Sequence, residues 1–199
     1  MSDPTTLRAL AGLPLEPAAL SDSALILIDC QNTYTYGVME LAGVQAALDE
    51  AAGLLDRARS AGIPVIHIQH DDGPGSLYDV SGHSGAIVER VAPRDDEQVV
   101  VKNYPNSFVA TDLDAELKAL NAQNLVIAGF MTHMCVNSTA RGAFNLGYSP
   151  TVVAAATATR ALPGVPHGEI SAENLQAASL AALSDLFAIV VPGTESIPA

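Results

Sequence analysis

The sequence has few cysteines and few basic residues. Its 199 residues include only two cysteines, Cys30 and Cys135, so no disulfide framework can form and we expect a reducing compartment. Nine Lys and Arg residues stand against 22 Asp and Glu residues, which gives a formal net charge of −13. Proteins that bind nucleic acid need clustered basic residues, and the sequence has no such cluster, so we exclude nucleic acid as a partner.

Long hydrophobic runs are also missing. No apolar run approaches the roughly 18 residues of a membrane helix, and the N-terminus lacks a basic flank followed by an apolar core. We therefore expect a cytoplasmic protein with no membrane partner. Charged residues make up only 16% of the chain, against 49% hydrophobic residues. Much of the surface of a single copy would be apolar, so we expect a homo-oligomer, either a dimer or a tetramer.

Short apolar runs alternate with segments of helical pattern. The run Ala24-Leu-Ile-Leu-Ile-Asp29 is continuous, which is typical of a parallel strand buried on both faces. The alternation predicts an α/β fold with three layers, in which helices flank both faces of a six-stranded parallel sheet. The predicted strands span residues 24–29, 63–68, 98–101, 124–128, 151–155 and 187–191. The predicted helices span residues 41–60, 111–120, 134–146 and 171–184.

The length of the chain fits one domain. Residues 1–22 precede the first strand and are predicted to form an N-terminal arm, and residues 23–199 are predicted to form the single domain. Residues 71–94 form a long excursion rich in Gly, Pro and Ser between the second and third strands. We expect this excursion to contribute to substrate selectivity.

Three chemically active side chains follow three of the predicted strands. Asp29 ends the first strand, Lys102 ends the third, and Cys135 follows the fourth where a helix begins. Ligands bind beyond the carboxyl ends of an open parallel sheet, so we expect the three at one edge. Each has an ordinary alternative, as a capping Asp, a solvated Lys or an inert core thiol. Together they fit a thiol nucleophile with a base and a stabilising charge.

The predicted helix start also suggests how such a thiol would act. A free thiol is mostly protonated at neutral pH, and a helix N-terminus and an ammonium both favour the thiolate. We expect Asp29 to take the proton and return it to a leaving amine. The backbone N–H groups of Met131 and Cys135 are candidates to hold an oxyanion, because N–H groups at a helix start are unpaired.

Side chains near the three predicted catalytic residues are candidates for a substrate pocket. Tyr34 and Tyr36 could form an aromatic wall, with core packing as the alternative. His70 ends the second strand and could line the pocket or serve only as a structural histidine. The candidate pocket residues are Gln31, Tyr34, Tyr36, His70, Tyr104, Phe108, Phe130 and Thr132.

Three segments of the sequence resemble the isochorismatase-like cysteine hydrolases. They read LILIDCQNTY (25–34), VKNYPNSFVATDLDAELKAL (101–120) and VIAGFMTHMCVNSTARGAFNLGYSPTVV (126–153). The resemblance extends from residue 24 to residue 191. It implies the family's six-stranded parallel sheet and its Asp–Lys–Cys triad, which falls on Asp29, Lys102 and Cys135. It also implies a cis peptide bond at Phe130–Met131.

One departure from the family concerns metal binding. Nicotinamidases of this superfamily bind a metal through an Asp-x-His pair and a further His, whereas residues 67–75 contain no such pair. His67 and His70 are three residues apart on a predicted strand, so they face opposite sides and cannot share a metal. We predict no metal and no cofactor.

The residues and the resemblance together predict a cysteine-dependent hydrolase of an amide or related C–N bond in a small molecule. The reaction would pass through a thioester acyl-enzyme. Family members that cleave the vinyl ether of isochorismate can use the acid without a cysteine, so a metal-free vinyl ether hydrolase is one alternative. A non-catalytic oligomeric protein that binds a small molecule on the same scaffold is another.

Overall fold

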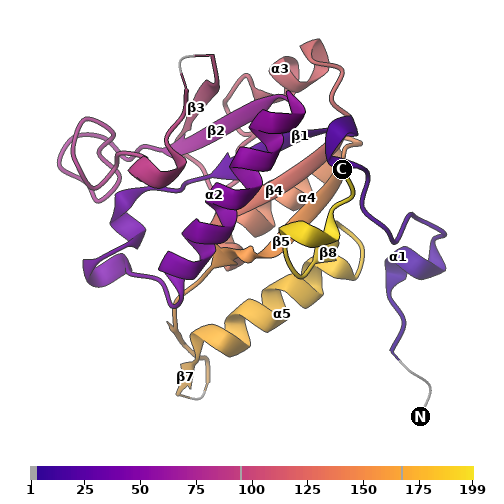
Figure 1. Ribbon diagram of the computed structural model, residues 1–199. Coiled ribbons are helices and arrows are strands. Elements are labelled where there is room, and N and C mark those ends of the chain that lie inside the picture. Colours follow the sequence, from indigo (N-terminus) through magenta and orange to yellow (C-terminus); the bar gives the residue numbers. More distant parts are fainter. Residues whose placement is uncertain (1–3, 95, 167) are drawn as a thin grey trace.

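The computed structural model describes residues 4–94, 96–166 and 168–199 (Figure 1). Its main sheet has six strands in the order β3-β2-β1-β4-β5-β8, and every neighbouring pair is parallel. The predicted sheet is therefore confirmed. The strands are β1 (Ser23–Ile28), β2 (Val65–His70), β3 (Gln98–Lys102), β4 (Asn124–Phe130), β5 (Ser149–Ala158) and β8 (Ile189–Val191).

Helices cover both faces of this sheet, and Figure 1 shows α2 in front of it and α4 behind it. Strand β1 explains the two layers, because successive side chains of a strand point to opposite faces. Leu25 and Leu27 belong to the core that contains α2, whereas Ile26 and Ile28 belong to the core that contains α3, α4 and α5. The helices are α2 (Val44–Ala61), α3 (Leu113–Ala119), α4 (Asn137–Asn145) and α5 (Ala172–Ser184).

The strand order places a switch point at the centre of the sheet. From β1 the chain runs to β2 and β3 on one side, and then crosses back to β4 on the other side of β1. Ligands of open α/β sheets bind at such a switch point, outside the carboxyl ends of the strands. The segments that follow β1 and β4 begin with Asp29 and Met131, so both start at this position.

The structure departs from the predicted elements where local pattern is weak. The predicted helix 134–146 begins earlier, as a π-helix over Thr132–Val136, and continues as α4. A short antiparallel hairpin of β6 (Leu162–Pro163) and β7 (Glu169–Ile170) was not predicted. Two-residue strands carry no readable period, so the sequence pattern could not reveal them.

The described part of the N-terminal segment, residues 4–22, lies outside the sheet and docks on the turn after α5. It contains the short helix α1 (Leu7–Leu10). Arg8 is buried and donates hydrogen bonds to Pro14 O (2.6 Å) and Leu186 O (2.9 Å), and Leu7 N donates to Asp185 Oδ1 (2.9 Å). Among the described residues, no helix has both the length and the apolar character needed to span a bilayer.

Candidate active site

Lys102 joins the predicted catalytic residues at the carboxyl edge of the sheet. Its Nζ donates hydrogen bonds to Asp29 Oδ2 (2.7 Å) and Cys135 Sγ (3.5 Å), which are 73 and 33 residues away in the sequence. Lys102 ends β3, and β2 separates β3 from β1. Neighbouring strands are about 4.8 Å apart, so only a long side chain can reach across β2 to the residue after β1.

The three side chains are removed from water. Asp29 is 0% exposed, Lys102 is 1% exposed and Cys135 is 5% exposed. Burying two opposite charges is costly unless they pair with good geometry, and the contact between Lys102 and Asp29 satisfies that condition. The other carboxylate oxygen, Asp29 Oδ1, is buried and has no hydrogen-bond partner among the described residues. That oxygen is therefore available to accept a proton.

The protonation of the thiol differs from our expectation. Burial raises the pKa of Cys135, and the Asp29 carboxylate raises it further, while the Lys102 ammonium acts in the opposite direction. Burial also raises the pKa of Asp29, against the effect of Lys102, and the neighbouring thiol lowers it. These effects together leave the pKa of Cys135 raised, so burial and the Asp29 carboxylate oppose the thiolate that we expected, whereas the contact with Lys102 favours it.

A tight turn after β4 positions Cys135. The Phe130–Met131 peptide is cis, as the resemblance implied, and Met131 O accepts hydrogen bonds from Met134 N (3.0 Å) and Val136 N (3.2 Å). The N–H of Met131 donates no hydrogen bond within the described ranges. It is therefore free to bind an oxygen of a ligand near Cys135, which lies on the same turn.

Two of the predicted pocket residues form an aromatic cluster around the triad. Tyr34 is buried, and its ring meets that of Phe130 edge-on with centroids 5.9 Å apart. Burial raises the pKa of Tyr34, and the charges of Asp29 and Cys135 both add to the shift. His70, a third predicted residue, contacts Lys102 directly, with 3.0 Å between His70 Nδ1 and Lys102 Nζ.

Gln31 and Thr132 are buried parts of the framework. Gln31 Nε2 donates to His70 O (2.9 Å) and Gly85 O (2.7 Å), which ties the excursion 71–94 to the end of β2. Gln31 is therefore held by backbone groups rather than facing an open pocket. Thr132 is 0% exposed, and its Oγ1 has no partner among the described residues.

Tyr36, Tyr104 and Phe108 have no hydrogen bond to a triad side chain within the described ranges. Tyr36 is half exposed and stacks on His83 (centroids 6.1 Å apart), and Tyr104 is also half exposed. Phe108 stacks on Tyr148, which comes just before β5 and so lies at the amino edge of the sheet. The pocket roles of Tyr36, Tyr104 and Phe108 stay predictions.

Two residues of the excursion 71–94 were missed. Tyr78 OH accepts a hydrogen bond from Tyr34 OH (3.3 Å). Burial raises the pKa of Tyr78, and the charges of Cys135 and Asp29 add to this shift. Asp72 Oδ1 lies 3.0 Å from His70 Nε2. An aromatic residue and an acid in a Gly-rich segment after β2 were the available signal, since that segment starts at the carboxyl edge.

The two histidines of β2 have separate partners on opposite sides. His67 Nε2 lies 2.9 Å from Glu97 Oε2, whereas His70 contacts Lys102 and Asp72. The described ranges contain no group of three or more His, Cys, Asp or Glu side chains that could hold a metal ion.

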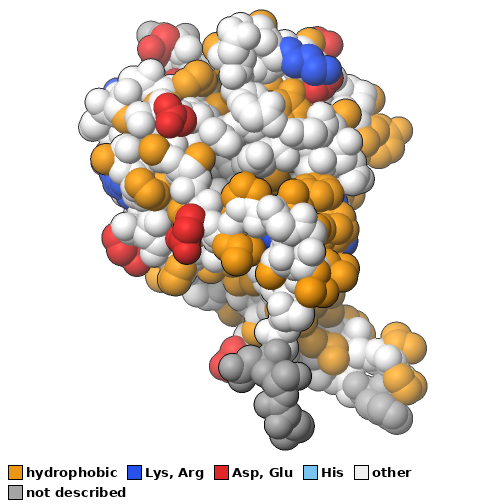
Figure 2. All heavy atoms as spheres, turned by 90° about the vertical axis from the view of Figure 1, so that its right-hand side faces the viewer, with side chains coloured by type: hydrophobic (Ala, Val, Ile, Leu, Met, Phe, Trp, Pro, Cys, Tyr) orange, Lys and Arg blue, Asp and Glu red, His pale blue; other side chains and the backbone are white. Residues whose placement is uncertain are grey.

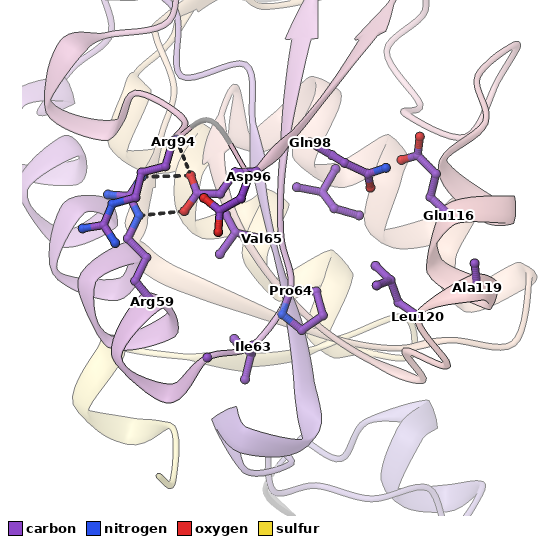
Figure 3. A pocket seen from close by; sticks show the side chains of 13 residues that line it. Arg59, Ile63, Pro64, Val65, Arg94, Asp96, Gln98, Glu116, Ala119 and Leu120 are labelled. Atoms are coloured by element: carbon purple, nitrogen blue, oxygen red, sulfur yellow. Dashed lines mark hydrogen bonds and ion pairs between the residues drawn. The ribbon is translucent and has the colours of Figure 1, made fainter.

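A hollow of about 600 Å³ lies at the opposite edge of the sheet. Figure 3 shows Arg59 and Arg94 on one side of it and Gln98 and Glu116 on the other, with Pro64 between them. Gln98 is the first residue of β3, whereas Lys102 is the last. This hollow is therefore separated from the triad by the length of the strand.

Comparison with known proteins identifies the family. The family model described as "Isochorismatase domain" matches residues 23–195. A secreted isochorismatase effector of Verticillium dahliae is 30% identical over 188 residues, which cover 94% of this chain and 96% of that protein. A ureidoacrylate amidohydrolase of Stutzerimonas stutzeri is 32% identical over 180 residues, which cover 71% of this chain and 73% of the relative.

A solved structure extends the agreement to the whole fold. The crystal structure of an isochorismatase from Pseudomonas putida superposes with a TM-score of 0.94 at 38% identity, covering 98% of this chain and 99% of the other. The match of the family model spans most of the sequence and includes Asp29, Lys102 and Cys135. The chain therefore belongs to the isochorismatase family of hydrolases.

Proposed function

We propose that the protein is a cysteine hydrolase that cleaves an amide or related C–N bond of a small molecule through a thioester. One observation carries the proposal: a single buried ammonium, that of Lys102, contacts both a carboxylate and a thiol. An acid, a cation and a thiol with these contacts are the parts that nucleophilic acyl transfer needs. The amidohydrolase activity named for the Stutzerimonas stutzeri relative is chemistry of this kind.

The first half of the reaction forms the thioester. Asp29 takes the thiol proton as the sulfur of Cys135 attacks the carbonyl carbon, and the Lys102 ammonium stabilises the sulfur while its charge develops. The N–H groups of Met131 and Cys135 bind the oxygen that becomes negative. Asp29 then gives the proton to the leaving nitrogen, the C–N bond breaks, and an amine or ammonia departs.

The second half releases the acid. Asp29 takes a proton from a water molecule, whose oxygen attacks the thioester carbon. The C–S bond breaks, the carboxylic acid leaves, and the proton returns to the sulfur of Cys135. Because the carboxylate and the thiol start the cycle as they end it, the reaction consumes one water and needs no cofactor.

The raised pKa of Cys135 fits a proton transfer that accompanies attack. A thiol that stays protonated in the free site avoids burying a second negative charge beside Asp29. The thiolate then forms only when the substrate carbonyl can receive its electrons. Near-complete burial of Cys135 and the packing of Tyr34 close to it favour a small substrate.

A panel of primary amides, ureas, N-carbamoyl compounds and lactams tests the proposed function. We expect at least one class to be hydrolysed, and we expect added hydroxylamine to divert part of the product into a hydroxamate, because hydroxylamine attacks a thioester. Hydrolysis of an enol ether with no activity on any amide would contradict the proposal and favour vinyl ether chemistry through Asp29. Inactivity on both, together with tight ligand binding, would favour a binding protein.

A further inference from the structure

We propose that His70 is a positioning residue that aligns the Lys102 ammonium between Asp29 and Cys135. This role rests on the proposed function, but it concerns a residue outside the Asp–Lys–Cys triad. His70 ends β2 and pairs in register with Lys102, which ends β3. The Lys102 side chain passes over this position on its way to Asp29, and His70 Nδ1 lies 3.0 Å from Lys102 Nζ.

The hydrogen bonds define the protonation of the imidazole. A lysine ammonium has three donors and no acceptor, so Nδ1 of His70 must accept from Nζ. In the tautomer that fits this contact the ring proton lies on Nε2, which then donates to Asp72 Oδ1 at 3.0 Å. Asp72 therefore selects the tautomer in which Nδ1 faces Lys102 with a lone pair.

The three donors of Lys102 are fully used in this arrangement. They reach Asp29 Oδ2 at 2.7 Å, His70 Nδ1 at 3.0 Å and Cys135 Sγ at 3.5 Å. The contact with sulfur is the longest, so it is the one that a small tilt of the ammonium would lose first. An acceptor at the position of His70 Nδ1 keeps the ammonium from turning wholly toward the carboxylate.

The surroundings hold His70 itself in place. Gln31 Oε1 accepts from His70 N (3.0 Å), Gln31 Nε2 donates to His70 O (2.9 Å), and the Tyr78 ring meets the imidazole edge-on with centroids 5.0 Å apart. The ionisable groups that face the ring are Lys102, Asp72, Tyr78 and, more distantly, Asp29. Backbone and ring are both fixed, as a positioning role requires.

Two substitutions separate positioning from packing. His70→Phe keeps a ring against Tyr78 but removes the acceptor, whereas His70→Asn places an amide oxygen near the position of Nδ1 but removes the ring. Misalignment of a catalytic group by about 1 Å can cost roughly 100-fold in rate, so we expect kcat of His70→Phe to fall by about 10- to 100-fold with KM changed less than about threefold. We expect His70→Asn to stay within about fivefold of wild type, and Asp72→Ala to lie between the two.

A second measurement does not need a substrate. The rate at which iodoacetamide alkylates Cys135, resolved by peptide mapping with Cys30 as the internal reference, reports how well Lys102 favours the thiolate. We expect slower alkylation of Cys135 in His70→Phe and a rate near wild type in His70→Asn. If the alkylation rates follow this order but no amide is hydrolysed, the positioning role of His70 is supported and the proposed amide hydrolysis is contradicted.

His70→Phe and His70→Asn could instead lose equally in kcat and in alkylation rate, with a Tm that falls in parallel. Such equal losses would show that His70 only supports the fold. That result would overturn the proposal. An unchanged kcat and an unchanged alkylation rate in His70→Phe would overturn it as well.

Discussion

The Lys102 ammonium lies where water does not reach, in a chain whose net charge is strongly negative. A buried charge without a partner would be severely destabilising, and here the partner is the carboxylate of Asp29. That pairing lets one cation serve two purposes. It neutralises Asp29 in the folded protein and stays in contact with the sulfur on which negative charge develops during attack.

At the residue scale, the three triad positions could be predicted because each lies at or just after the end of a strand that is recognisable from its apolar run. Parallel topology then brings their side chains to one edge. The roles of Tyr78 and Asp72 could not be predicted, because the excursion 71–94 has no period that fixes where its side chains point. The upward shift in the pKa of Cys135 was also missed, since a sequence does not show how deeply a side chain is buried.

Breaking the buried ion pair tests its contribution to stability. Removing one partner of a buried pair typically costs about 3–5 kcal/mol, because the other charge is left uncompensated. We expect Asp29→Asn and Lys102→Met each to lower the free energy of unfolding on this scale in urea titrations. The double variant should lose clearly less than the sum of the two.

Additive losses would show that the two side chains are not coupled. A matched control is the exposed pair of Lys118 and Asp114, which lie four residues apart on α3 at 2.6 Å. Lys118→Met should change stability little, since water already screens that pair.

At the element scale, β4 can approach β1 closely only because its residue 129 is glycine. Gly129 has φ +111°, and a Cβ there would lie 2.0 Å from Ile28 O. This approach sets the turn that carries Cys135 beside the residue that follows Ile28, which is Asp29. The positions of the six strands along the chain were predictable from hydrophobic runs, but their ends were not, since β5 spans Ser149–Ala158 where residues 151–155 were predicted. The π-helix after β4 was not predictable either, because the contact between β4 and β1 is not visible in the sequence pattern.

Replacing Gly129 tests that dependence. We expect Gly129→Ala to lower the yield of folded protein or reduce Tm sharply, because the new methyl group collides with backbone. Gly53→Ala is the matched control, since Gly53 is exposed within α2 and a Cβ there meets no atom within 4 Å. That variant should gain about 0.8 kcal/mol from improved helix propensity. Equal Tm values for the two variants would contradict this account of the turn.

A partly buried polar network joins α2, β2 and the loop before β3. Glu97 accepts hydrogen bonds from Arg59 Nε (2.7 Å) and from Arg94 N (2.9 Å). Its Oε2 atom also lies 2.9 Å from His67 Nε2. Burial alone would raise the pKa of Glu97, but these hydrogen bonds outweigh it and lower the pKa to about 2, from an ordinary value of 4.5.

This shift predicts a specific loss of stability in acid. A carboxyl group whose pKa is lowered by folding stabilises the protein at pH values above the pKa that the group has in the unfolded chain. That contribution disappears as the pH falls from 4.5 to about 2. We expect the difference in free energy of unfolding between wild type and Glu97→Gln to shrink across this range in urea titrations. A difference that stays constant with pH would show that Glu97 does not act through its charge.

At the scale of the whole molecule, apolar surface is the prominent feature. Figure 2 views the side that carries the N-terminal segment and shows many hydrophobic and few charged side chains. The exposed residues of that segment include Leu7, Leu10 and Leu15. Large exposed apolar areas indicate contact with another molecule, and in a homo-oligomer the second copy covers them.

The mass in solution tests the expected assembly. We expect light scattering after size-exclusion chromatography to give two or four times the chain mass of 20.5 kDa. Leu10→Glu, which places a charge on the exposed part of α1, should shift the distribution toward smaller species if α1 contributes to the contact. A mass of 20.5 kDa at all concentrations would contradict the expectation of an oligomer.

The identity of the nucleophile is the central claim, and Cys135 and Cys30 provide a direct comparison. Both thiols are buried, but Cys30 packs in the core on the α2 face and contacts Ile28 O at 3.8 Å, away from Lys102. The deciding measurement is kcat/KM for an amide that the wild type hydrolyses. We predict a loss of at least about 10³-fold in Cys135→Ala and less than about fivefold in Cys30→Ala. Turnover near the wild-type value in Cys135→Ala would show that Cys135 is not the nucleophile.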